Sequence, residues 1–209
     1  MLKTENLSFK YENGNSFLFP DIDTQDGGIT LVLGKSGIGK STLLHLLAGL
    51  MPPHTGNIWV NQEDISQMKG SNLDQYRGKN IGIIFQQNHF ISSLSVLENL
   101  LLAQSLAGNE VNSKKCLNTL KQLNIEEKAN KKTNQLSQGE RQRAAIARAL
   151  VNSPSLILAD EPTSALDDEN CEIVIDLLSH IAKQNNSALV VVTHDGRLKS
   201  KELDTIVLH

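Results

Sequence analysis

Short apolar runs and helix-spaced apolar repeats alternate along most of the chain. Runs of consecutive apolar residues predict strands that are covered on both faces, at residues 27–34, 155–161 and 188–194. Shorter or alternating runs predict further strands at 6–11, 56–61, 80–86 and 204–209. Helical spacing of apolar residues predicts helices at 41–50, 95–108, 114–132 and 168–184. This order of elements predicts the α/β class, with a mostly parallel sheet and crossover helices.

The start of the chain predicts antiparallel pairing instead. Residues 6–11 alternate between apolar and polar side chains, which is typical of a half-buried strand. Asn13-Gly14 follows, and this pair favours a tight hairpin turn. We therefore expect an antiparallel β subdomain at the N-terminus, beside the parallel sheet.

The pattern changes between about Ser92 and Thr133, where helical repeats carry charged faces. We interpret this part as a helical lobe, about residues 90–135, inserted into a single domain that spans residues 1–209. The stretch 126–135 is rich in lysine and asparagine, and its charge pattern favours a solvated loop.

Composition narrows the class of protein. The 209 residues suffice for one domain with an inserted lobe, and 39% hydrophobic with 21% charged residues fits a globular protein. A net charge of −3 and only 4% aromatic residues give neither a basic field nor stacking platforms, so we expect no nucleic-acid partner. Cys116 and Cys171 lie far apart in the sequence and predict no disulfide framework or metal site. The first residues lack the apolar core of a signal peptide, and no apolar window is long enough to span a membrane, although the chain can dock on a membrane protein.

A phosphate-binding loop is the clearest motif. Residues 34–42, GKSGIGKST, fit the pattern G-x-x-x-x-G-K-[ST] between a predicted strand and a predicted helix. Glycines let successive backbone N–H groups curl around a phosphate, and the helix N-terminus adds partial positive charge. Lys40 would reach the β- and γ-phosphates, and the Ser41 hydroxyl suits Mg²⁺. The residues expected to bind the nucleotide here are Gly34, Lys35, Ser36, Gly37, Ile38, Gly39, Lys40, Ser41 and Thr42.

Two adjacent carboxylates follow a later apolar strand. Asp160 and Glu161 end the run SLILADE. Asp160 would hold the Mg²⁺ shell through water. Since neighbouring strand residues point to opposite faces, Glu161 would polarise the attacking water without competing for the metal.

Taken together, the motifs make the chain resemble the ATP-binding subunit of an ABC transporter. The resemblance covers essentially the whole chain, and the motifs stand in the family order: residues 34–42, Gln86, 136–140, 156–161, 164–167 and His194. It implies a P-loop NTPase core of the RecA-like type, ATP and Mg²⁺ as cofactors, and ATP hydrolysis as the activity.

The stretch LSQGE, residues 136–140, resembles the family signature LSGGQ, and we call it the signature segment. Ser137 and Glu140 also fit a capping box, so the same residues predict an ordinary helix start. In the family, the signature of one subunit covers the γ-phosphate held by another, which implies that Ser137, Gly139 and Glu140 bind ATP across a two-fold dimer of two copies. Gln138 and Glu140 depart from the usual glycine and glutamine, which bears on the turnover rate.

Further site residues come from the same resemblance. Gln86 would contact Mg²⁺ or the attacking water and hinge the lobe, although by itself it also suits an exposed strand end. His194 ends an apolar strand and resembles the switch histidine that contacts the γ-phosphate. Tyr11 would stack on adenine, with a half-buried strand tyrosine as the alternative. Asp167, in the SALD stretch 164–167, would lie beside the phosphate-binding loop of the partner copy.

The resemblance also implies an output for ATP turnover. The lobe and the run after Gln86, QNHFISSLSVLENL, would form a groove for a helix of an integral membrane permease subunit. This run resembles the subfamily that serves lipoprotein-release, macrolide-export and division-linked transporters, which places the protein peripherally on the cytoplasmic face of the inner or plasma membrane. The alternatives are a soluble ABC ATPase without a transport role and a regulatory module that binds ATP. The first would need a coiled coil, a zinc insertion or a second ATPase half, and the second would be expected to lose Glu161 or His194.

Overall fold

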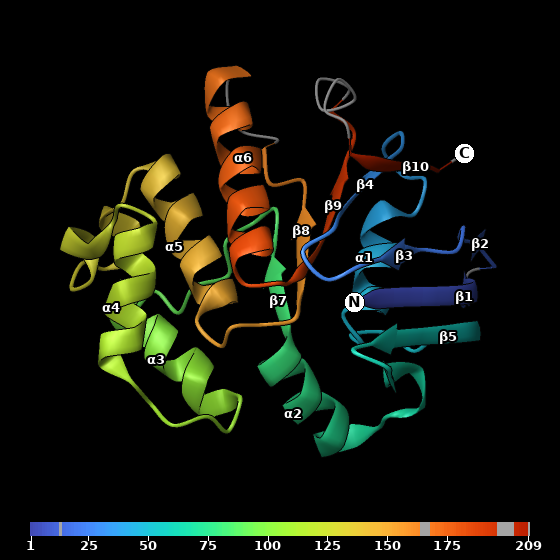
Figure 1. Cartoon of the computed structure of the whole chain (residues 1–209), viewed down its shortest axis with the longest axis horizontal. Coiled ribbons are helices and arrows are strands. Elements are labelled where there is room, and N and C mark those ends of the chain that lie inside the picture. Colours follow the sequence, from blue (N-terminus) through green and yellow to red (C-terminus); the bar gives the residue numbers. More distant parts are fainter. Residues whose placement is uncertain (13, 164–167, 196–202, 209) are drawn as a thin grey trace.

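The structure is a computed structural model that describes residues 1–12, 14–163, 168–195 and 203–208, with only the backbone described for 168–173. Two sheets pack around helix α1 (Figure 1). The strands are β1 Leu2–Lys10, β2 Ser16–Leu18, β3 Asp23–Thr24, β4 Ile29–Leu33, β5 Thr55–Val60, β6 Glu63–Asp64, β7 Ile81–Ile84, β8 Leu156–Asp160, β9 Ala188–Thr193 and β10 Asp204–Val207. The α-helices are α1 Lys40–Leu47, α2 Gly70–Asn80, α3 Val96–Leu106, α4 Ser113–Gln122, α5 Gln138–Leu150 and α6 Asp168–Gln184. Single 3-10 turns are η1 Ile65–Gln67, η2 Glu126–Lys128 and η3 Thr133–Gln135.

The central sheet is parallel, as the alternating pattern predicts. Its strand order in the described part of the chain is β10-β4-β9-β8-β7, and each neighbouring pair is parallel. Strands β4, β8 and β9 are buried along their whole length. The ends of β4, β8 and β9 therefore meet at one edge, where the residues that follow them can form a site.

The smaller sheet is antiparallel, which confirms the N-terminal β subdomain. Strand β1 pairs with β2, β3 and β5, and β6 continues the sheet beyond β5. Asn13, the first residue of the predicted hairpin turn, lies outside the described residues, whereas Gly14 has the positive φ of 93° that the turn needs.

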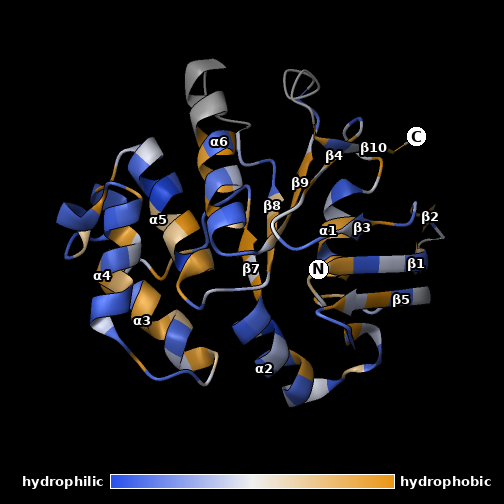
Figure 2. Cartoon of the chain, viewed as in Figure 1, coloured by the Kyte–Doolittle hydropathy of each residue, from blue (hydrophilic) through white to orange (hydrophobic). Residues whose placement is uncertain are grey.

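The core divides along the two faces of the parallel sheet. In β4, Ile29, Leu31 and Leu33 belong to the hydrophobic cluster that includes residues of α3, α4, α5 and α6, whereas Val32 belongs to the cluster that includes α1 and the antiparallel sheet. Because strand side chains alternate between faces, one buried strand joins both halves of the core. Figure 2 shows hydrophobic residues along the central strands and polar residues on the outer faces of the helices.

Three sequence expectations need correction. Strand β7 ends at Ile84, so Gln86 lies in the segment after the strand and not at its end. The helix expected at 114–132 ends at Gln122, and residues 126–135 are mostly exposed, as expected, although they include the turns η2 and η3 and bury Ala129 and Thr133. Helix α2 has no counterpart in the predicted elements. Within the described residues, no helix is both long and apolar enough to cross a membrane.

Candidate functional site

The phosphate-binding loop connects the end of β4 to the start of α1. Gly39 caps the helix with φ 101°, a left-handed value that only glycine adopts without strain. A Cβ atom at Gly39 would lie 2.7 Å from the ring of Phe17, so the loop also has no room for a side chain there. The first helical residue is Lys40, which places the lysine at the positive end of α1.

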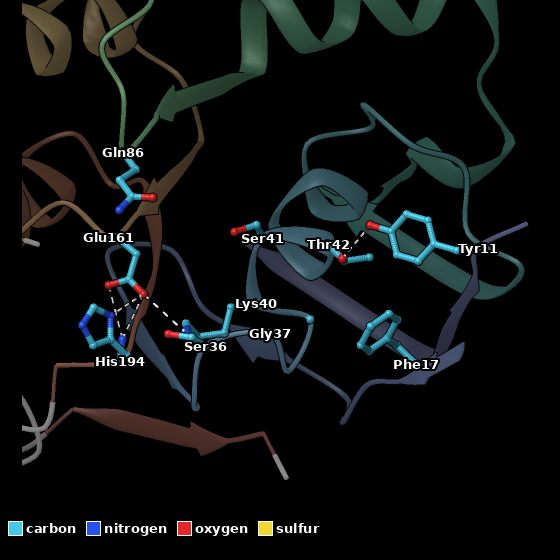
Figure 3. Close-up of a pocket in the computed structure, with 11 residues that line it drawn as sticks. Tyr11, Phe17, Ser36, Gly37, Lys40, Ser41, Thr42, Gln86, Glu161 and His194 are labelled. Atoms are coloured by element: carbon cyan, nitrogen blue, oxygen red, sulfur yellow. Dashed lines mark hydrogen bonds and ion pairs between the residues drawn. The ribbon is translucent and has the colours of Figure 1, made fainter. Parts of the chain in front are cut away.

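The phosphate-binding loop borders a cavity of about 410 Å³. The end of β8, the segments after β7 and β9, and the N-terminal β subdomain supply its other walls (Figure 3). Its lining residues are Tyr11, Phe17, Ser36, Gly37, Gly39, Lys40, Ser41, Thr42, Gln86, Glu161 and His194. Residues far apart in the sequence, which were expected to act on one nucleotide, therefore meet at one cavity.

Lys40 is only 7% exposed, and three oxygen atoms lie near its ammonium group. It donates to the carbonyl oxygens of Gly34 at 2.8 Å and Lys35 at 3.1 Å. The same nitrogen lies 3.5 Å from Oε1 of Glu161. These contacts hold the cation at the mouth of the loop, where a phosphate would lie.

The buried carboxylate of Glu161 accepts hydrogen bonds from two residues at the end of β9. The Thr193 hydroxyl donates to its Oε2 at 2.9 Å, and the His194 backbone N–H donates to its Oε1 at 3.1 Å. Nδ1 of the His194 ring also lies 2.9 Å from Oε1. Burial raises the pKa of Glu161, but the hydrogen bonds from His194 and Thr193 outweigh burial and hold the pKa below its usual range. The lowered pKa keeps Glu161 ionised at neutral pH.

The side chains of Asp160 and Glu161 point in different directions, but the alternation of side chains along a strand is not the reason. Strand β8 ends at Asp160, and Glu161 has φ 47°, in the left-handed region that non-glycine residues rarely adopt. This backbone conformation directs Glu161 toward the end of β9 while Asp160 faces Ser41 on α1. Such strain is common at functional sites, because the surrounding structure imposes it.

Asp160 does not line the cavity, and its buried Oδ1 has no hydrogen-bond partner among the described residues. Burial is the main reason that its pKa is raised, and a hydrogen bond with Ser41 lowers it in part. A buried carboxylate oxygen without a partner is costly, and a cation beside it would remove that cost.

Tyr11 lies at the end of the cavity away from Glu161 (Figure 3). Its hydroxyl is 2.9 Å from that of Thr42, and its ring packs edge-on against Phe9 and Phe17. Phe17 was not identified from the sequence, yet it forms the wall beside Tyr11. Its only sequence signal is its place in the apolar run 17–19.

Other residues expected at the site lie outside this cavity. The side chain of Ile38 lines a second pocket, with Leu208. Ser137, Gly139 and Glu140 of the signature segment do not line the cavity either. The stretch 164–167, which contains Asp167, lies outside the described residues.

The signature segment forms the capping box that its sequence also predicts. Oγ of Ser137 accepts the N–H of Glu140 at 3.3 Å, and Oε2 of Glu140 accepts the N–H of Ser137 at 2.8 Å. The Ser137 hydroxyl proton is not used by the cap. It can be donated to an anion at the N-terminus of α5.

The comparisons with known proteins agree with one family. The sequence matches the ABC transporter family over residues 20–164. It is 42% identical over 177 residues to the lipoprotein-releasing system ATP-binding protein LolD of Buchnera aphidicola subsp. Schizaphis graminum (strain Sg), covering 84% of this chain and 77% of that protein. It is 38% identical over 215 aligned residues to LolD of Legionella pneumophila (strain Paris), covering 100% of this chain and 95% of that one.

A solved structure shows the same fold. A dimeric post-hydrolysis state of the ATP-binding cassette MJ0796, bound to ADP and Pi, matches with a TM-score of 0.86 at 33% identity. The match covers 100% of this chain and 94% of that one. The chain therefore belongs to the ABC transporter family, and it is the ATP-binding cassette type of subunit that hydrolyses ATP.

Proposed function

We propose that this chain is the ATPase subunit of a lipoprotein-releasing type of ABC transporter. It acts as one domain over residues 1–209 with the helical lobe at about 90–135, on the cytoplasmic face of the membrane. Its partners are an integral membrane permease subunit and a second copy of itself. The observation that carries the proposal is the cavity itself: Lys40, Glu161 and His194 line it together, while the signature segment lies elsewhere on the same chain.

Each of these cavity residues would have a separate role in γ-phosphoryl transfer. Lys40 would exchange its contact with Glu161 for the β- and γ-phosphates, which suits its place at the helix N-terminus. The freed Glu161 carboxylate would orient and polarise the attacking water, and His194 and Gln86 would contact the γ-phosphate and that water. Tyr11, with Phe17 beside it, would contact the adenine base.

The residues present also fit Mg²⁺. The unpartnered Oδ1 of Asp160 and the Ser41 hydroxyl are hard oxygen donors, and Gln86 lines the same cavity. Among the described residues, no three His, Cys, Asp or Glu side chains form a metal cluster of their own. Such a sparse donor set suits Mg²⁺, which keeps waters and phosphate oxygens as its other ligands. When bound, the ion would neutralise charge on the phosphates.

The signature segment would complete the site of a second copy. Ser137 and Gly139 present a hydroxyl and a first-turn backbone N–H at the start of α5, the same type of anion site as the phosphate-binding loop. Bound ATP would then be contacted by two chains in the closed dimer only, so that it shifts the equilibrium toward closure. The dimeric arrangement of the cassette MJ0796 supports this arrangement.

A groove beside the lobe suits the permease partner. A cavity of about 540 Å³ lies between α2, the end of β7, α3 and α5. Phe85, His89 and Leu106 line it, and Leu106 is 75% exposed. Large apolar side chains in an open groove are typical of a site for an amphipathic helix. The names of the LolD relatives support the lipoprotein-releasing type.

The test of the catalytic assignment is Glu161→Gln, with Glu126→Gln as a surface control. Because the amide cannot accept the proton, we expect ATP turnover to fall by about 10²-fold or more, while the affinity for ATP is kept. Steady-state hydrolysis and equilibrium binding of a fluorescent ATP analogue measure the two effects. A Glu161→Gln variant with normal turnover would remove Glu161 from this role.

A further inference from the structure

The signature segment of this chain carries a charge that opposes its proposed ligand. Glu140 stands in the first turn of α5, and its carboxylate closes the capping box on Ser137. A phosphate that approaches this helix end is attracted by the first-turn N–H groups and the Ser137 hydroxyl. The formal negative charge of Glu140 in the same turn repels that phosphate.

Protonation cannot remove this charge near neutral pH. The backbone N–H of Ser137 and the ammonium group of Lys128 hold the pKa of Glu140 at about 2. The charge must therefore be compensated by a cation if the signature segment is to accept an anion.

Lys128 lies at the position where compensation is needed. It ends the turn η2, and its Nζ is 3.0 Å from Oε1 of Glu140. The other oxygen of Glu140 is occupied by the cap. The two side chains are 32% and 21% exposed, so they are partly shielded from solvent, which weakens the screening between them.

We propose that Lys128 is a positioning residue of the ATP site, which neutralises Glu140 so that the signature segment can accept the γ-phosphate held by a second copy. Lys128 acts through Glu140 and does not touch the nucleotide. The inference rests on the proposed function, because it requires an ATP shared between two copies.

A purely structural role for the ion pair between Lys128 and Glu140 would predict a different result. If the ion pair only fastened the turn to the helix, loss of either partner would have the same effect. If charge compensation is the role, loss of Lys128 is harmful and loss of the Glu140 charge is not. Glu140→Gln keeps an oxygen that can accept the Ser137 N–H, so the capping box survives the change.

The experiment measures the ATP-dependent dimer in a Glu161→Gln parent, which binds but does not consume ATP. Into this parent go K128M, K128R, E140Q and K128M with E140Q, with K131M as the matched control at an exposed lysine three residues further along. Sedimentation gives each dimer dissociation constant, fluorescent ATP gives each nucleotide affinity, and thermal unfolding checks each fold. Every measurement is repeated at about 1 M salt, where the Debye length is about 3 Å.

K128M is expected to weaken the dimer on the order of fivefold at low salt, with ATP affinity unchanged and with the loss reduced at high salt. The dimer dissociation constants of K128R and K131M should stay within about twofold of that of the parent. E140Q should dimerise at least as tightly as the parent. The double variant K128M with E140Q should dimerise as tightly as E140Q alone. The inference would be overturned if K128M and E140Q weakened the dimer equally, or if K128M left the dimer dissociation constant of a dimerising parent unchanged. Either result would leave the proposed function standing. A parent that stays monomeric with ATP would instead refute the proposed function, and this inference with it.

Discussion

At the scale of single residues, Glu161 connects the end of β8 to the end of β9 and to the start of α1. One carboxylate accepts hydrogen bonds from Thr193 and His194 and pairs with Lys40. Its left-handed backbone conformation is fixed by a hydrogen bond from its N–H to the carbonyl oxygen of Val192. These contacts bring Lys40, Glu161 and His194, the residues that we propose act on the γ-phosphate, to the same cavity.

Gly39→Ala tests how tightly the phosphate-binding loop is packed. The change introduces a Cβ at φ 101°, which costs about 1–2 kcal/mol, and places it 2.7 Å from the Phe17 ring. We expect binding of fluorescent ATP to fall by about tenfold or more. In a Phe17→Ala background, compared with Phe17→Ala alone because Phe17 also lines the cavity, Gly39→Ala should cause a smaller loss of binding, since the clash is gone but the backbone strain remains. If Gly39→Ala caused no loss of ATP binding in the Phe17→Ala background, or the same loss as in the wild type, the assignment of the loss to both a clash and backbone strain would be wrong.

Glu140 gives the site a defined response to acid. Its pKa is lowered from 4.5 to about 2, so the stability that its cap contributes is present above 4.5 and is lost as the pH falls toward 2. Relative to Glu140→Gln, the wild type should lose free energy of unfolding between these two values. Urea unfolding of both proteins from pH 7 to pH 3 measures the difference, and a constant difference across this range would contradict the assigned cap.

At the scale of elements, the residue that follows strand β10 packs against the start of the phosphate-binding loop. Leu208, which follows β10, is 7% exposed and donates its N–H to the carbonyl oxygen of Leu33 at 2.8 Å. A Cβ at Gly34 would lie 2.7 Å from the Ile38 side chain and 3.3 Å from the Leu208 Cβ. The start of the loop, Ile38 and the residue after β10 therefore pack as one unit.

Leu208→Ala should loosen this unit. The change leaves a cavity behind the loop, which costs about 2–3 kcal/mol of unfolding free energy, and we expect ATP affinity to fall several-fold as well. Val207→Ala is the matched control, because Val207 is 44% exposed and the same truncation removes little packing. Urea unfolding and ATP binding separate the two effects. Equal losses in the two variants would show that the loop does not depend on Leu208.

The elements differ in how well the sequence predicts them. Strands such as β4, β8 and β9 were located from their apolar runs, because burial on both faces demands continuous hydrophobic residues. Helix α2 was missed since it has no fully buried residue, so its polar sequence shows no apolar stripe. Phe17 was missed for a related reason: only the folding of the β subdomain against Gly39 makes it part of the site.

On the scale of the whole molecule, Asn152 joins the lobe to the core. Its amide nitrogen donates to the carbonyl oxygens of Gly78 in α2 at 2.9 Å and Ala103 in α3 at 3.1 Å. Its oxygen accepts from Asn109 at 3.0 Å. One side chain after α5 thus connects three segments beside the groove that we propose for the permease.

Asn152→Ala should therefore destabilise the protein by about 1–3 kcal/mol, since it leaves two half-buried carbonyl oxygens without this donor. Asn109→Ala, which removes a single hydrogen bond of the same group, should cost about 1 kcal/mol or less. Urea unfolding measures both. A larger loss for Asn109→Ala than for Asn152→Ala would contradict the junction described for Asn152.

The sharing of ATP between two copies is the central claim at this scale, and the most direct measurement of it is sedimentation of Glu161→Gln with and without Ser137→Phe. A bulky apolar side chain at Ser137 removes the hydroxyl and blocks the signature segment, but it leaves the phosphate-binding loop of the same chain untouched. We expect Glu161→Gln to be a dimer with ATP and a monomer with ADP, and the double variant to bind ATP as a monomer. A double variant that still dimerises with ATP would contradict the account.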